Sequence, residues 1–144
     1  MQLSPDGAGP LWTFLAGRHH GVLATIKRDG RPQLSTVSFA YATSDRTISV
    51  SITDGRAKTA NLRRDPRASL HAASDDGWAY VVAEGTAALS PVAQATDDET
   101  VEGLVHLYKT LRGDHPNWDE FRQAMVDEGR LLLRIHVDRV YGMA

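Results

Sequence analysis

The chain has 144 residues, of which 42% are hydrophobic and 24% are charged, and its formal net charge is −2. This size and composition are typical of a single globular domain with a substantial core, here residues 1–144, and the near-neutral charge argues against nucleic acid as the main partner. Since the chain has no cysteine, it has no disulfide framework, no thiolate metal site and no thiol nucleophile.

The first half of the chain predicts one short helix followed by three strands, at residues 8–16, 21–28, 31–41 and 47–53. Between the first two strands, Asp29-Gly30 favours a two-residue hairpin turn, because glycine accepts the positive φ that such a turn requires. In the third strand, strict alternation predicts that Ile48, Val50 and Ile52 are buried.

The second half predicts two strands, a helical insertion and a last strand, at residues 67–73, 78–89, 91–129 and 131–141. Within the insertion, one amphipathic helix is expected from Thr96 to Gly113 and another ends near Gly129. Gly85 predicts a bulge or a close backbone approach. Antiparallel hairpins in this order favour a mainly β fold with α insertions, closed into a barrel because closure removes exposed edges.

A short basic helix follows directly on the third strand, at residues 54–66. Asp54 is expected to cap this helix and Pro66 to end it. Arg56 and Lys58 would then lie in the first turn, where the helix dipole disfavours cations. The pattern therefore predicts a bound anion, with phosphate the natural candidate; the alternative is that both cations are solvated surface charges.

Polar side chains also alternate along the strands that lead to this helix. One face of the second strand carries Gln33, Ser35 and Val37, and the third strand places Ser51 and Thr53 next to the basic helix. These groups either are satisfied surface groups or form a row that faces a ligand. No Walker lysine loop, glycine-rich dinucleotide turn or Gly-x-Ser-x-Gly elbow accompanies them.

Membrane and metal partners are not indicated. No apolar run approaches the about 20 residues that span a bilayer, and the first residues lack the regions of a signal peptide, so we expect a cytoplasmic protein. The histidines are scattered, and the adjacent pair His19-His20 would point in different directions in any regular element. We therefore predict no metal site.

Four segments together resemble a known family: 21–26 (Gly-Val-Leu-Ala-Thr-Ile), 29–33 (Asp-Gly-Arg-Pro-Gln), 56–66 (Arg-Ala-Lys-Thr-Ala-Asn-Leu-Arg-Arg-Asp-Pro) and 76–80 (Asp-Gly-Trp-Ala-Tyr). In this order they are similar to the split β-barrel flavin/deazaflavin oxidoreductases, relatives of pyridoxamine 5′-phosphate oxidase, and most similar to group B enzymes that use the deazaflavin coenzyme F420. The resemblance covers almost the whole chain. It implies a split β-barrel of the PNPOx-like, FMN-binding type, and a homodimer with two cofactor sites between the subunits.

The resemblance also implies roles for particular residues at the phosphate end of the site. Arg56 and Lys58 would hold the cofactor phosphate, and Asn61, one turn beyond Lys58 on the same side of the helix, would also belong to the cofactor site. The anionic oligoglutamate tail of F420 has possible surface partners among the remaining arginines, namely Arg63, Arg64, Arg67 and Arg130.

At the ring end of the site, the resemblance places Gln33, Ser35 and Val37 along the deazaflavin ring and Ser51 near the ribityl chain. Trp78 from the other subunit would form a wall of the pocket; alternatively, Trp78 is simply a core aromatic residue.

The function that the resemblance implies is F420H2-dependent reduction of an activated double bond in an organic small molecule, such as an enone or a tetrapyrrole like biliverdin. No catalytic side chain is required, because the cofactor carries the hydride chemistry. The alternatives are an FMN-dependent oxidase or reductase of the same fold, and a non-catalytic carrier that binds F420 or a flavin.

Overall fold

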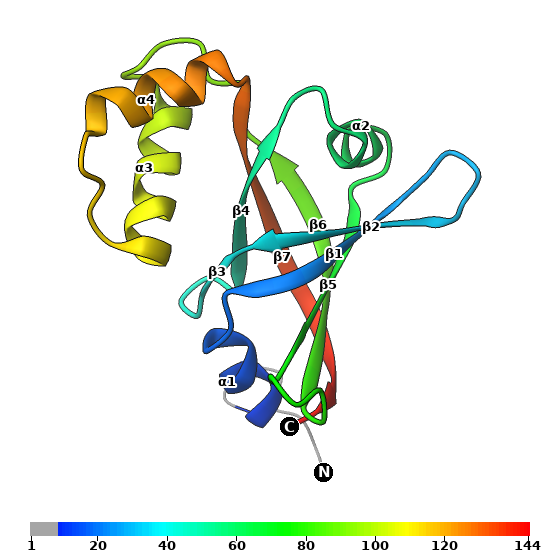
Figure 1. Ribbon diagram of the computed structural model, residues 1–144. Helices are drawn as coiled ribbons and strands as arrows, with labels where there is room; N and C mark the ends of the chain where they lie inside the picture. Colours follow the sequence, from blue (N-terminus) through cyan, green and yellow to red (C-terminus); the bar gives the residue numbers. More distant parts are fainter. Residues whose placement is uncertain (1–8) are drawn as a thin grey trace.

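Residues 9–144, which the computed structural model describes, contain seven strands in one curled sheet (Figure 1). The strands are β1 (His20–Ile26), β2 (Pro32–Ser38), β3 (Ala40–Ala42), β4 (Thr47–Thr53), β5 (Arg67–Ala73), β6 (Tyr80–Leu89) and β7 (Arg130–Met143). Their order is β2-β1-β5-β6-β7-β4-β3, and all neighbours are antiparallel. The edge strands β2 and β3 form no ladder with each other within this part of the chain. The sheet is therefore curled but not closed: the split barrel that the resemblance implied is confirmed, whereas the closed barrel expected from the hairpins was wrong.

Alternation along the strands places the main core inside the curl of the sheet. On β4, Ile48, Val50 and Ile52 are all buried, as predicted. They share one core with Leu131 and Leu133 of β7, the strand that pairs with β4. Although segments 47–53 and 130–136 are far apart in sequence, their pairing is what joins β4 and β3 to the rest of the sheet.

The expected strand over residues 31–41 is interrupted at Phe39. This side chain is 0% exposed, and its backbone N–H donates to the carbonyl oxygen of His19 at 2.8 Å. Beyond this point β3 pairs with β4, whereas β2 pairs with β1. The prediction of one continuous strand was wrong, because the chain changes pairing partner while the alternation of side chains continues.

Two glycines determine local geometry in the sheet, one at a hairpin turn and one at a bulge. Gly30 has a φ of 87°, and its N–H donates to the Lys27 carbonyl oxygen at 2.9 Å. The connection is three residues long and not two, since Lys27 and Arg31 still pair. Gly85 lies at a register shift between β6 and β7, where a Cβ atom would collide with the carbonyl oxygen of His136. The predicted bulge is confirmed.

The described residues form four helices, α1 (Pro10–Ala16), α2 (Ala57–Arg64), α3 (Glu99–Arg112) and α4 (Trp118–Asp127). Ala8, where the first helix was expected to begin, lies outside the described residues. Residues 91–95, expected to be helical, are irregular, and α3 begins later because the Asp98 carboxylate caps it, accepting from the Val101 N–H at 2.8 Å.

The helices lie on different sides of the sheet (Figure 1). α2 lies on one side of β4, whereas α3 and α4 stand together on the other side and form a second, smaller core with Leu132 of β7. Among the described residues, none of the helices combines the length and apolar character needed to cross a membrane. The space between α2 and the α3–α4 pair is the part of the fold that carries the site.

Candidate functional site

α2 presents its positively charged N-terminal end without a side-chain cap. Arg56 is the N-cap residue, with φ −87° and ψ 153°, and no side chain caps the helix. Asp54, expected to be the cap, instead forms an ion pair with Arg63 at 2.7 Å, so that prediction was wrong. Asp54 lies two residues before the N-cap, and the arginine in the last turn engages its carboxylate. The first N–H groups of α2 therefore remain available to an anion.

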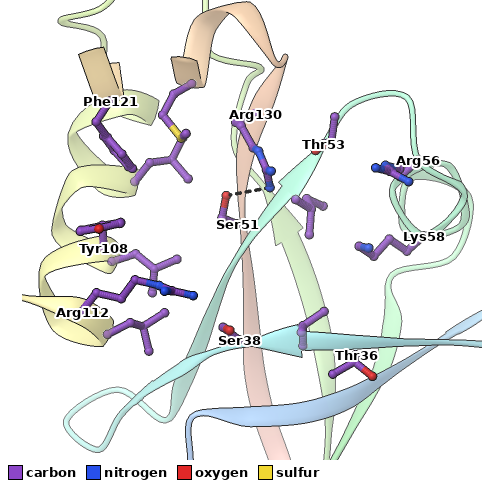
Figure 2. Close-up of a pocket in the computed structure, with 16 residues that line it drawn as sticks. Thr36, Ser38, Ser51, Thr53, Arg56, Lys58, Tyr108, Arg112, Phe121 and Arg130 are labelled. Carbon is purple, nitrogen blue, oxygen red and sulfur yellow. Dashed lines mark hydrogen bonds between the residues drawn. The ribbon is translucent and has the colours of Figure 1, made fainter. Parts of the chain in front are cut away.

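A cavity of about 510 Å³ lies between α2 and the α3–α4 pair (Figure 2). It is lined by residues of β2, β4, α2, α3, α4 and β7: Thr36, Val37, Ser38, Ser51, Ile52, Thr53, Arg56, Lys58, Leu104, Leu107, Tyr108, Leu111, Arg112, Phe121, Met125 and Arg130. This volume suits a small organic molecule or a cofactor.

The charged lining of the cavity is entirely cationic. It comprises Arg56, Lys58, Arg112 and Arg130, with no acidic side chain. Burial lowers the pKa of Lys58, and the positive charges of Arg56 and Arg130 lower it further. Arg130 pairs with Glu128 at 3.0 Å, whereas the other three cations form no ion pair within residues 9–144. An anionic ligand would offset this uncompensated charge.

The opposite wall of the cavity is apolar. α3 and α4 contribute it through Leu104, Leu107, Leu111 and Met125 together with two aromatic rings. The rings belong to Tyr108 and Phe121, whose centroids are 5.1 Å apart. The cavity therefore places cations from the start of α2, the start of β7 and the end of α3 around an apolar surface, which fits a ligand that combines anionic groups with a flat apolar ring.

Four of the predicted site residues meet in this cavity: Val37, Ser51, Arg56 and Lys58. The Ser51 hydroxyl also accepts from the Arg130 guanidinium at 3.5 Å. Ser35 of β2 does not line the cavity; its hydroxyl is buried and has no hydrogen-bond partner among the described residues. Trp78 is 80% exposed on the β5–β6 connection, so the alternative that it is a core residue was wrong.

Gln33 and Asn61 contact each other and not the cavity. The Asn61 amide, 7% exposed, donates to the Gln33 side-chain oxygen at 2.8 Å and to the Thr25 hydroxyl at 3.1 Å. Asn61 was expected on the same side of the helix as Lys58, but it does not line the cavity, because Thr25 of β1 and Gln33 of β2 engage its side chain. Asn61 faces β1 and β2 and holds α2 against them.

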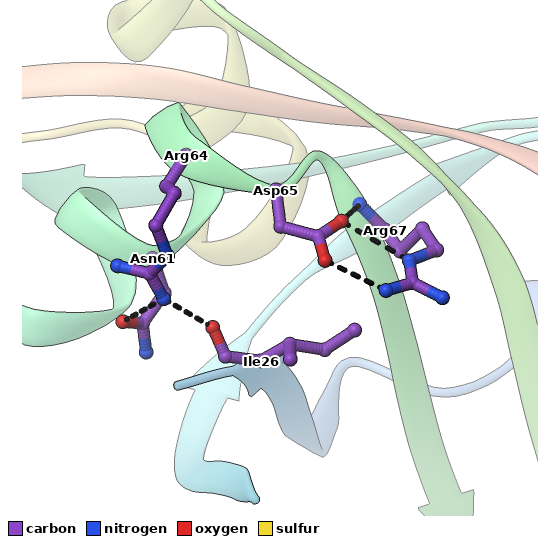
Figure 3. Close-up of polar contacts among 5 residues, drawn as sticks. All are labelled: Ile26, Asn61, Arg64, Asp65 and Arg67. Atoms are coloured by element: carbon purple, nitrogen blue, oxygen red, sulfur yellow. Dashed lines mark hydrogen bonds and ion pairs between the residues drawn. The ribbon is translucent and has the colours of Figure 1, made fainter. Parts of the chain in front are cut away.

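Arg64, in the last turn of α2, strengthens this attachment (Figure 3). The Arg64 guanidinium donates to the Ile26 carbonyl oxygen at 2.7 Å and to the Asn61 side-chain oxygen at 3.2 Å. Arg67 donates to both carboxylate oxygens of Asp65, which lowers the pKa of Asp65 to about 2. The surface arginines considered for the oligoglutamate tail, Arg63, Arg64, Arg67 and Arg130, thus all have partners within the chain.

We predict that replacing Asn61 with alanine lowers the free energy of unfolding by about 1–3 kcal/mol, because the buried Thr25 hydroxyl and the half-buried Gln33 side chain lose their partner. Urea denaturation followed by circular dichroism measures this change. Gln94→Ala is the control, since the Gln94 side chain is exposed and its removal should change stability by less than about 0.5 kcal/mol. Equal stabilities for the two variants would contradict the anchoring role of Asn61.

Several cavity residues could not be identified from the sequence. Tyr108 and Phe121 belong to amphipathic helical patterns that are typical of ordinary core packing, and Arg112 is a favourable cation in the last turn of a helix. Thr36 and Ser38 lie on the face of β2 opposite to the one selected from the sequence. Within the described part of the chain, no group of three or more potential metal ligands is arranged to hold an ion.

The chain thus combines a split barrel with a cationic cavity at the end of β4. The sequence model of the pyridoxamine 5′-phosphate oxidase family matches residues 11–144, so the chain belongs to this family. The family resemblance noted in the sequence is thereby confirmed.

Three individual relatives each share 28% sequence identity or less with the chain. The chain is 28% identical over 131 residues to an F420H2-dependent biliverdin reductase from Mycobacterium tuberculosis, covering 91% of this chain and 84% of the relative. A solved F420 reductase has the same fold, with a TM-score of 0.70 and 18% identity over 92% of this chain and 96% of the other. So has a FAD-binding protein from Mesorhizobium loti, with a TM-score of 0.63, 18% identity and coverage of 92% and 90%.

Proposed function

We propose that this protein is an F420H2-dependent reductase, which transfers a hydride from reduced deazaflavin to an activated double bond of an organic small molecule. The observation that carries the proposal is the pair Arg56 and Lys58, which faces the cavity without a carboxylate partner in the described chain, beside uncapped N–H groups of α2. The named activity of the curated relative supports F420 over other cofactors.

The residues of this chain would bind and orient the cofactor. Arg56 and Lys58 would hold its phosphate through charge-assisted hydrogen bonds. Val37 and Ser51 would lie along the rest of the molecule, and the apolar wall from α3 and α4 would exclude water. When bound, F420H2 supplies the hydride, so the protein needs no catalytic side chain of its own. Gln33 and Asn61 would act indirectly, by fixing α2.

We further propose that the protein works as a homodimer, with the cofactor sites between subunits. Large apolar side chains are exposed on the described surface at Leu34, Trp78, Tyr141 and Met143, and a second subunit could cover some of them. Trp78 would then be a wall of the partner's cavity, and Ser35, with its unpartnered hydroxyl, would lie near the ring. Sedimentation velocity distinguishes monomer from dimer.

Two alternative functions are also supported by features of the cavity. FMN carries a phosphate that Arg56 and Lys58 would hold equally well, so an FMN-dependent oxidase or reductase would use the same site. A carrier that binds F420 or a flavin without catalysis also fits, because the cavity lining includes no acidic side chain.

Titration of the purified protein with F420 and with FMN tests the proposal. Binding is followed by fluorescence and by the thermal unfolding midpoint, and a panel of enones and tetrapyrroles is then offered with F420H2. We expect F420 to bind and at least one of these compounds to be reduced. Tight FMN binding without F420 binding would overturn the proposal, and F420 binding without any reduction would favour the carrier.

A further inference from the structure

A small side pocket adjoins the main cavity at the C-terminal end of α3. It has a volume of about 190 Å³ and is lined by His19, His20, Ser38, Leu111 and Arg112. The main cavity shares three of these residues, Ser38, Leu111 and Arg112. The side chain of Arg112 therefore borders both the main cavity and the side pocket.

The side pocket presents hydrogen-bond donors and no acidic group. Arg112 is exposed and forms no ion pair with the described residues. The His19 Nδ1 lies 3.4 Å from the Phe39 carbonyl oxygen, so its N–H is directed at the backbone and the donors left for a ligand are those of Arg112 and Ser38. Together with the hydroxyl of Ser38, Arg112 makes this pocket complementary to an anion.

This second cationic end is separate from the phosphate end of the site. Arg112 reaches into the cavity from α3, whereas Arg56 and Lys58 enter from α2 on the other side (Figure 2). One phosphate on α2 leaves Arg112 without a counterion. The cavity as a whole therefore calls for two anionic groups held apart, with apolar surface between them.

The apolar surface next to Arg112 indicates what kind of molecule carries the second anion. Leu107, Tyr108 and Leu111 precede Arg112 along the same face of α3 and line the main cavity. A planar guanidinium binds a carboxylate through two parallel hydrogen bonds. Resting on the proposed function, we propose that Arg112 is a specificity-determining residue, which binds a carboxylate of the substrate while the conjugated body of the substrate packs on α3.

A matched pair of probes tests this inference: biliverdin, which carries two carboxylates, and its dimethyl ester, which carries none. Binding of each probe is followed by absorbance, both with oxidised F420 present and with cofactor-free protein, and kcat/KM is measured with F420H2. Arg112→Gln is compared with Arg134→Gln, which removes an exposed arginine of β7 that lies outside the cavity.

We expect the unaltered protein to bind biliverdin about tenfold more tightly than the ester, the difference made by one charge-assisted contact. Arg112→Gln should abolish this preference and lower kcat/KM for biliverdin about tenfold, without changing the affinity for F420 or the unfolding midpoint. Arg134→Gln should change none of these quantities.

Equal binding of acid and ester by the unaltered protein, or binding of neither, would overturn the inference. So would a loss of F420 affinity in Arg112→Gln, because Arg112 would then serve the cofactor. Failure of the proposed function would look different: F420 would not bind or no hydride would be transferred, while the cofactor-free titration would still report whether Arg112 selects the acid.

Discussion

Replacing Lys58 with alanine is expected to weaken F420 binding by about 1.5–3 kcal/mol, or roughly 10- to 150-fold in Kd. The ammonium group faces the cavity, and burial together with the charges of Arg56 and Arg130 lowers the pKa of Lys58. A bound phosphate offsets the repulsion among Lys58, Arg56 and Arg130. The Lys58→Ala variant loses the charge-assisted hydrogen bond from the ammonium group to this phosphate. Fluorescence titration with F420 measures the change.

Lys27→Ala is the matched control, since Lys27 is an exposed lysine that does not line the main cavity. Its replacement should leave the Kd for F420 within about twofold, because exposed charges outside a site contribute little. If Lys58→Ala bound F420 as tightly as this control does, the phosphate would have to lie elsewhere than at the N-terminal end of α2.

Replacing Phe39 with alanine should lower the free energy of unfolding by about 3–5 kcal/mol, the range for a large aromatic side chain lost from a packed core. Phe39 is 0% exposed and lies where the chain passes from β2 to β3. The substitution leaves a cavity at the point where the two edges of the sheet meet. Denaturant unfolding with an unchanged m-value measures the effect.

Leu34→Ala on β2, the strand that precedes Phe39, provides the comparison, because Leu34 is 63% exposed and loses little buried area. Its effect should stay within about 0.5 kcal/mol in the isolated subunit. If Phe39→Ala were as stable as Leu34→Ala, the region around Phe39 would have to repack after the substitution. The Phe39 side chain would then not be needed to stabilise the passage from β2 to β3.

Local patterns predicted much of the sheet. β5 was placed correctly over Arg67–Ala73, and the bulge at Gly85 followed from a glycine inside a strand. What the sequence could not show was a change of partner. The alternation of β2 continues through Phe39 although the pairing changes there, since alternation records burial and not which strand lies alongside.

The site was predictable where it depended on local electrostatics. Arg56 and Lys58 stand out in the sequence as cations at the N-terminal end of a helix, where the helix dipole disfavours positive charge. Both line the cavity. Arg112 was not found, because a cation in the last turn of a helix is normal and only the tertiary placement of α3 turns it toward the cavity. Asn61 was misplaced for a related reason: its burial depends on where β1 and β2 lie, not on its own helix.

The positive charges of the cavity come from segments that meet only in the native fold. Arg56 and Lys58 belong to the helical segment after β4, and Arg130 begins the last strand. The unfolded chain therefore offers no comparable anion site, and under the proposed function any bound cofactor selects the folded form by mass action. At a free cofactor concentration 100 times the Kd, this linkage adds about 2.7 kcal/mol to stability. Cofactor supply would then govern the lifetime and abundance of the protein in addition to its turnover.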